Sequence, residues 1–114
     1  MEESKIIKIE KNDSVDVGGT SYFGCCFNRT VSEVEALLGS PTYSTNNYFE
    51  KTQREWYCLC TRESGETFPI TIYNYKDYDS FKEDNKTEWH IGGRNGSETA
   101  EALGWFQLRF LKMI

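Results

Sequence analysis

The strongest structural signal in the chain is Phe68-Pro69-Ile70-Thr71-Ile72-Tyr73-Asn74-Tyr75-Lys76. Isoleucine, threonine and tyrosine favour β-strands, so this block predicts a strand over residues 67–75 that runs out into a lysine. Residues 53–61 also favour a strand, because their apolar side chains divide between two alternating faces. Residues 62–66 have the polar and glycine content of a turn. We therefore expect the two strands to pair as an antiparallel hairpin.

The second informative block is Glu88-Trp89-His90-Ile91-Gly92-Gly93-Arg94-Asn95-Gly96-Ser97. Residues 89–91 predict a third strand, which would follow the charged residues 77–86 and extend the hairpin into a meander. The glycines predict a turn, and Ser97 can cap a helix. Acidic residues begin this helix and basic residues end it, as the helix dipole prefers.

A shorter helix is expected nearer the N-terminus. Thr30-Val31-Ser32-Glu33 is a capping box, in which each of the two outer side chains accepts the backbone N–H of the other residue. Gly39 and Pro41 predict the end of this helix. Residues 5–10 predict a short first strand. We therefore expect residues 1–114 to form a single α+β domain: a mainly antiparallel sheet with helices on one side, with a short helix after the first strands and a C-terminal helix.

The C-terminal segment is apolar over more than one face. One helical stripe contains Leu103, Phe106, Phe110 and Met113, and another contains Trp105, Leu108 and Leu111. Such a helix packs against more than its own sheet, and we expect a second subunit of a homo-oligomer to be its partner. The alternation across residues 106–110 leaves a terminal strand as an alternative.

The charge of the chain limits its partners. The formal net charge is -5, and the pI is near 4.9. Both argue against binding to duplex nucleic acid, because that affinity comes from many phosphate contacts made by lysine and arginine. An anionic ligand would therefore be small and bound locally. The N-terminal residues lack the hydrophobic region of a signal peptide, and no apolar run has the length of a membrane span, so we expect a cytosolic protein without membrane contacts.

The four cysteines are Cys25, Cys26, Cys58 and Cys60. Their Cys-Cys and Cys-x-Cys spacings differ from the Cys-x2-Cys spacing of zinc knuckles, and a cytosolic setting disfavours disulfides. We expect free, buried thiols and no metal or other cofactor, with a four-thiolate metal site as the alternative.

Aromatic and basic residues together indicate a ligand. Rings interleaved with cations suit a base that stacks while its phosphates meet positive charge. The glycines before the final helix match neither a Walker A loop nor a Rossmann fingerprint, although helix-terminal N–H groups and an arginine can bind phosphate. The chain has one histidine, and nothing in the spacing pairs it with a nucleophile, so we expect no catalysis. The candidate stacking residues are Tyr43, Trp56, Tyr75 and Trp89, the candidate phosphate contacts are Lys51, Lys76 and Arg94, and His90 and Asn95 are candidates for reading base edges or ribose.

The blocks occur in the order seen in a family of small phage-encoded proteins. They are Phe23-Gly24, Leu38-Gly39-Ser40-Pro41-Thr42-Tyr43, residues 51–56, Thr71-Ile72-Tyr73-Asn74-Tyr75-Lys76 and Trp89-His90-Ile91-Gly92-Gly93. On these blocks, which extend from residue 22 to the final helix, the chain resembles the phage sponge proteins that counter CBASS defence. The cysteine pairs, and Tyr75 at a position where the pattern has tryptophan, depart from the family and leave the identity of the ligand open.

The resemblance implies a non-enzymatic phage immune-evasion protein that sequesters a cyclic dinucleotide such as 3′,3′-cGAMP in the host bacterial cytosol. It also implies a homo-oligomer, with a tetramer as one possible form. The alternative function is that of an acidic protein–protein inhibitor of a host defence enzyme, which the net charge of -5 also fits. A pocket that combines aromatic rings with cations would favour the first function, whereas a flat patch rimmed by acids would favour the second.

Overall fold

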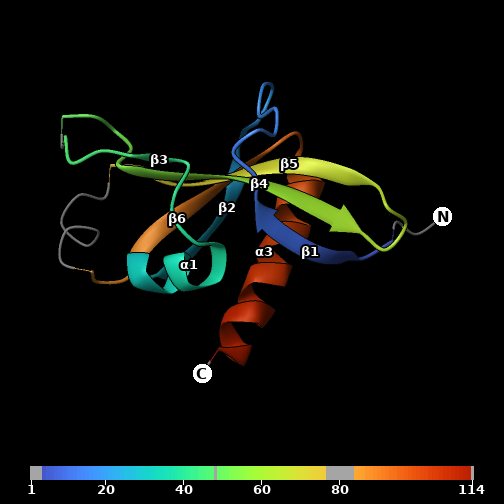
Figure 1. Ribbon diagram of the computed structural model, residues 1–114. Coiled ribbons are helices and arrows are strands. Elements are labelled where there is room, and N and C mark those ends of the chain that lie inside the picture. The colour runs from blue at the N-terminus through green and yellow to red at the C-terminus, as the bar shows by residue number, and fades with distance from the viewer. Residues whose placement is uncertain (1–3, 48, 77–83, 114) are drawn as a thin grey trace.

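The predicted hairpin lies at the centre of the sheet. The computed structural model describes residues 4–47, 49–76 and 84–113 (Figure 1). Within these residues a six-stranded antiparallel sheet has the order β1-β4-β5-β6-β2, and β3 pairs with β4. The strands are β1 (Ile6–Lys11), β2 (Ser21–Arg29), β3 (Tyr43–Ser44), β4 (Arg54–Arg62), β5 (Thr67–Asn74) and β6 (Thr87–Gly93). The α+β fold and the β4-β5-β6 meander are therefore confirmed.

Two helices accompany the sheet, α1 (Val31–Leu38) and α3 (Gly96–Lys112). The capping box of α1 is confirmed: the Thr30 hydroxyl accepts the Glu33 N–H at 3.1 Å, and the Glu33 carboxylate accepts the Thr30 N–H at 2.9 Å. The expected cap of α3 was wrong, because Asn95 caps this helix by accepting the Glu98 N–H at 2.8 Å. The segment is helical through Lys112, so the alternative terminal strand does not form.

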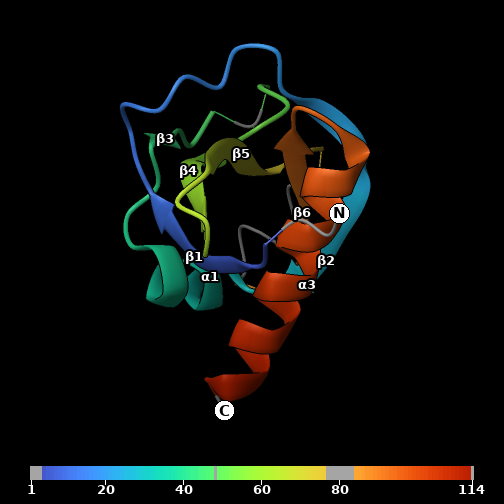
Figure 2. The ribbon, with the colours of Figure 1, turned by 90° about the vertical axis from the view of Figure 1, so that its right-hand side faces the viewer.

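The sheet curls, and α3 lies on its open side. Helix α3 contacts β1 and β2, which are the two edge strands, and also β6 (Figure 2). The face of the sheet that is turned toward the buried core is called the inner face below, and the opposite face the outer face. The C-terminal end of α3 extends beyond the sheet in both views (Figures 1 and 2).

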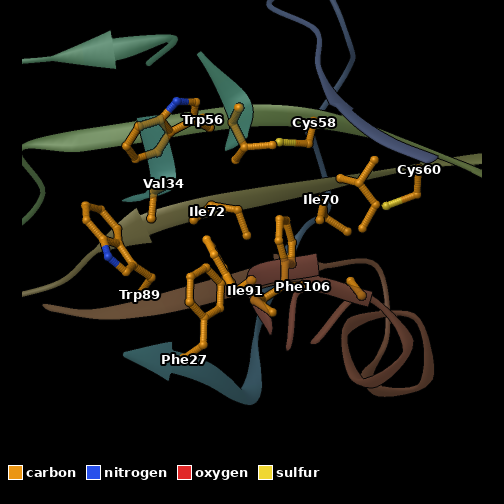
Figure 3. Packing of buried hydrophobic residues seen from close by; sticks show 14 of the residues in the cluster. Phe27, Val34, Trp56, Cys58, Cys60, Ile70, Ile72, Trp89, Ile91 and Phe106 are labelled. Carbon is orange, nitrogen blue, oxygen red and sulfur yellow. The ribbon is translucent and has the colours of Figure 1, made fainter. Parts of the chain in front are cut away.

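The core forms because alternate residues of each strand turn to the inner face. Figure 3 shows these side chains meeting residues from both helices and β2. The cluster contains Ile9, Phe27, Val34, Leu38, Trp56, Cys58, Cys60, Phe68, Ile70, Ile72, Trp89, Ile91, Ala102, Phe106 and Phe110. It connects every strand except the short β3 to both helices, so it organises the whole of the described structure around one core.

Strand β2 was missed by the sequence prediction. The register of β2 against β6 shifts between Tyr22 and Cys26, and Gly24 in this interval has a φ of 93°. A bulge of this kind interrupts the alternation by which strands are recognised. Most of the expected charged loop, residues 77–83, lies outside the described residues. Neither helix in the described part of the chain is long and apolar enough to cross a membrane.

Candidate functional site

One row of side chains crosses the outer face of the sheet. The register pairs Tyr43 with Glu55, Glu55 with Tyr73, Tyr73 with His90, and His90 with Cys26. Directly paired residues of antiparallel strands project to the same side, so these side chains form a continuous line across β3, β4, β5, β6 and β2. This line is called the outer row below. It combines aromatic, acidic and imidazole groups on the face opposite to the core.

A second row lies beside the first and contains a glycine. The register pairs Tyr57 with Thr71, and both Thr71 and Tyr22 with Gly92. A Cβ atom at position 92 would lie 2.5 Å from Thr71 Oγ1 and 3.5 Å from Tyr73 Cε1. The first distance is shorter than van der Waals contact, so only glycine lets these side chains close over β6. Gly92 therefore lets the side chains of β5 lie close to the backbone of β6 on the outer face.

The hollow above Gly92 has a volume of about 200 Å³ and is called the smaller hollow below. Side chains of β4 and β5 form its walls, and the segment between β1 and β2 contributes to its rim. It is lined by Val17, Thr20, Ser21, Glu55, Tyr57, Thr71, Tyr73 and Gly92. Hydroxyl groups and one carboxyl group thus surround this space. Its volume is smaller than the range of about 300–1,000 Å³ found for pockets that enclose whole ligands.

A larger hollow of about 490 Å³ adjoins the smaller one. It is lined by Tyr43, Phe49, Glu50, Lys51, Thr52, Glu55 and Tyr57. Glu55 and Tyr57 line both hollows, so they form the shared wall. The Tyr43 hydroxyl donates to the Glu50 carboxylate, and this hydrogen bond raises the pKa of Tyr43.

Lys76 adjoins Lys51, which lines the larger hollow, and the two residues are called the lysine pair below. The backbone N–H of Lys76 donates to the Lys51 carbonyl at 2.8 Å. The Lys76 ammonium lies 5.4 Å from the centre of the Tyr75 ring, within the range of a cation–π contact. The Tyr75 ring in turn lies 5.8 Å from the His90 ring of the outer row. Positive charge and aromatic surface are therefore contiguous at this end of the sheet.

His90 is the centre of an aromatic cluster formed by Tyr22, Tyr73, Tyr75 and His90. The Tyr22 ring is stacked on His90 at 4.3 Å between centroids, whereas Tyr73 meets His90 edge to face at 5.5 Å. His90 Nε2 lies 3.0 Å from a carboxylate oxygen of Glu88. Tyr22 is 43% exposed and Tyr75 40%, so both rings can be reached by a ligand.

Glu55 supplies the carboxyl group of the outer row. Its side chain makes no hydrogen bond or ion pair with any residue that the structure describes. Burial raises the pKa of this carboxyl, because the charged form loses part of its hydration. Burial and the nearby Glu55 carboxylate also raise the pKa of Tyr73. A ligand with N–H donors would supply the hydrogen bonds that Glu55 lacks.

The structure brings five of the sequence-predicted residues to this region and places the others elsewhere. Tyr43, Lys51, Tyr75 and His90 lie at the outer row, at the larger hollow or in the aromatic cluster, and Lys76 contacts Tyr75 and Lys51. They derive from four separate segments of the chain, which the register of the sheet aligns.

Trp56 and Trp89 do not offer stacking surfaces. Both side chains are fully buried on the inner face, where the rings meet edge to face at 5.4 Å. The Trp56 indole N–H donates to the Gly39 carbonyl at 2.9 Å, and that of Trp89 donates to the Arg29 carbonyl at 2.8 Å. Their faces are occupied by the core, so their role as candidate stacking residues is corrected to a structural one.

Arg94 and Asn95 lie at the junction of β6 and α3, at the opposite end of β6 from Glu88. Arg94 makes two hydrogen bonds to the Glu98 carboxylate, at 3.0 and 2.6 Å. Asn95 is the N-cap of α3. Both side chains thus stabilise the start of the helix, away from the aromatic cluster.

The sequence interpretation did not select Glu55, Tyr57, Tyr73 and Tyr22 as candidate site residues. The hairpin prediction contained the signal for the first three, since pairing β4 with β5 already sets Glu55 opposite Tyr73 and Tyr57 opposite Thr71. Tyr22 lies next to the bulge of β2, and its position depends on a strand that the sequence pattern did not reveal.

The thiols do not form a common site. Cys58 and Cys60 lie in the core, where burial raises the pKa of Cys58 to about 12 and also raises that of Cys60. Cys26 belongs to the outer row on the other face. Within the described ranges, no group of three or more His, Cys, Asp or Glu side chains could hold a metal ion, which contradicts the four-thiolate alternative. The cysteines are free in this structure.

No protein-family model matches the sequence, and comparison with curated proteins and with solved structures gives no match. The function is therefore inferred from the geometry of the outer face and from the sequence blocks described above.

Proposed function

We propose that this protein binds a cyclic dinucleotide on its outer face and sequesters it without turnover. The observation that carries the proposal is the continuity of the aromatic cluster, the two hollows and the lysine pair on one face. Aromatic rings provide stacking surfaces for bases, and ammonium groups attract phosphates. Lys51 and Lys76 thus supply positive charge for a small anion beside hollows that also carry Glu50 and Glu55.

The bases and phosphates of a cyclic dinucleotide equal in number the hollows and lysines of this face. It carries two bases and two phosphates on a compact ring. The face has two adjoining hollows, and Lys51 and Lys76 lie next to them. The resemblance of the sequence blocks to the phage sponge proteins supports the same ligand class, including 3′,3′-cGAMP, and a role in the host bacterial cytosol.

The proposal includes a homo-oligomer formed through α3 and β1. Leu108 and Leu111 on α3 are 62% and 61% exposed, and Ile7 on β1 is also exposed. A hollow of about 230 Å³ between the two elements is lined by Ile6, Ile7, Trp105, Leu108, Arg109 and Lys112. Apolar side chains gathered in this way favour burial against another surface, and a second copy of the chain is the partner that the resemblance implies.

Titration calorimetry against a panel of cyclic di- and trinucleotides tests the proposed function. We expect binding of at least one member, with the ligand recovered intact by chromatography after release. Lys51→Ala and Lys76→Ala should each weaken binding, whereas Lys8→Ala, which changes an exposed lysine paired with Glu10, should not. Degraded ligand would indicate an enzyme. An absence of heat across the panel would contradict the proposal and favour the acidic protein–protein inhibitor.

A further inference from the structure

We propose that the smaller hollow is a pocket for the Watson–Crick edge of guanine, read by the Glu55 carboxylate. The inference rests on the proposed function, because it assigns one base of the bound cyclic dinucleotide. It adds a residue and a base preference that neither the sequence motifs nor the resemblance supplies. The carrying observation is a half-buried carboxyl without a described partner at the wall of a cavity.

The size of the cavity favours one base rather than a whole ligand. Its volume of about 200 Å³ lies below the range of about 300–1,000 Å³ that is typical of complete ligand pockets. Gly92 of β6, Tyr57 of β4 and Tyr73 of β5 are all among the residues that line the space. A planar ring can enter between such walls, and the sugar and phosphates would remain outside.

The chemistry of Glu55 selects among the bases. An ionised carboxylate has only acceptors, and it forms its strongest hydrogen bonds with paired N–H donors. Guanine presents N1–H and the N2 amino group side by side, so both carboxylate oxygens can be satisfied. Adenine presents the N1 acceptor beside its N6 amino group, and this acceptor would face a carboxylate oxygen. Two acceptors that face each other without a hydrogen atom between them cost free energy, so the pocket favours guanine over adenine.

The charges around the hollows favour the orientation in which the base lies at Glu55 and the phosphates lie near the lysines. Glu55 lines both hollows, whereas Lys51 lines only the larger hollow, and its carbonyl accepts the backbone N–H of Lys76. Phosphates are repelled by the Glu55 carboxylate and attracted to the two ammonium groups. A guanine base at Glu55 therefore leaves the phosphates toward the lysines.

The test is titration calorimetry of the full chain with c-di-GMP, 3′,3′-cGAMP and c-di-AMP. We expect the two guanine-containing ligands to bind the wild type about tenfold or more tightly than c-di-AMP, as bidentate base contacts typically discriminate. Glu55→Gln should weaken c-di-GMP binding by about tenfold and strengthen c-di-AMP binding, because an amide offers one donor and one acceptor to adenine. Glu63→Gln, which neutralises an exposed residue of the β4–β5 turn, is the matched control and should change neither affinity.

The outcomes separate the two proposals. Equal affinity of the wild type for all three ligands would overturn the guanine pocket and leave cyclic-dinucleotide binding intact. A uniform loss of affinity in Glu55→Gln, or an unchanged guanine preference, would also overturn the pocket, since either result gives Glu55 no part in base selection. If none of the three binds, while other members of the wider panel do, the pocket is again overturned. Failure of every cyclic nucleotide to bind overturns the proposed function itself.

Discussion

The Tyr22 ring lies parallel to the imidazole of His90, with ring centroids 4.3 Å apart and an interplanar angle of 19°. Tyr22 comes from β2 and His90 from β6, so the stack joins an edge strand to its neighbour on the outer face. One face of Tyr22 is occupied by His90, and the ring remains 43% exposed. The stack can therefore be extended by a base without rearranging the core.

Replacement of Tyr22 by alanine is expected to weaken cyclic-dinucleotide binding by about tenfold, because base–aromatic stacking contributes on the order of 1–3 kcal/mol per base. Tyr22→Phe retains the ring and should bind nearly as tightly as the wild type. Calorimetric titration of both variants measures the difference. Equal losses in the two variants would show that the hydroxyl, and not the ring face, is what the ligand needs.

Gly92 and Gly104 are predicted to respond oppositely to alanine. At position 92 a Cβ would lie 2.5 Å from Thr71 Oγ1, whereas at position 104 nothing lies within 4 Å of it. Thr71 is buried and β-branched, so it has little freedom to move away. Gly92→Ala should therefore destabilise the fold by about 1–3 kcal/mol, as overpacking does, while Gly104→Ala, in an exposed part of α3, should stabilise it by up to about 1 kcal/mol. Urea unfolding measures both changes. A neutral Gly92→Ala variant would contradict the close contact.

Glu55 and Glu33 are predicted to give opposite pH dependences of stability. Burial raises the pKa of Glu55, so the folded state keeps this proton to a higher pH than the unfolded chain does. Stability from this group therefore falls as the pH rises above about 4, the pKa of an unfolded glutamate. The hydrogen bond from the Thr30 N–H, together with Arg29, lowers the pKa of Glu33, so the stability it contributes is lost as the pH falls through that range.

Thermal unfolding of Glu55→Gln and Glu33→Gln between pH 3 and pH 7, compared with the wild type at each pH, measures these slopes. Glu55→Gln should gain stability relative to the wild type as the pH rises, and Glu33→Gln should lose it. Parallel curves for wild type and Glu55→Gln would show that this carboxyl is as well hydrated in the folded state as in the unfolded chain.

The buried Arg62 is predicted to be essential for stability. It is 2% exposed, and its guanidinium donates to the Glu101 carboxylate at 2.6 and 3.2 Å and to the Ser4 carbonyl at 2.8 Å. These bonds join β4 to α3 and to the segment before β1. Arg62→Ala should cost about 3 kcal/mol, since it removes the charged donor of these hydrogen bonds from a buried position. Denaturant unfolding measures the loss, and Lys86→Ala, at an exposed position just before β6, is the control.

The hairpin, the capping box and the meander could be predicted because each is encoded by residues close together in the sequence. The candidate site could be predicted only in part, since its rows depend on register between strands far apart in the chain. Trp56 and Trp89 illustrate the limit: alternation places each on one face of its strand, but does not say which face meets the helices. Glu55 was recoverable from the hairpin register, whereas Tyr22 required knowledge of the bulge in β2.

Introducing charge on the exposed side of α3 is predicted to dissociate the proposed oligomer. Leu108→Glu with Leu111→Glu places two carboxylates on apolar positions that need no change in the core, because both side chains are mainly exposed. Light scattering after size-exclusion chromatography should give an oligomer for the wild type and a monomer for the double variant, with unchanged circular dichroism. Gln107→Glu adds charge at an exposed polar position of the same helix and should leave the mass unchanged. A wild type that stays monomeric at high concentration would contradict assembly through this face, because the apolar side chains would then remain in water without a partner.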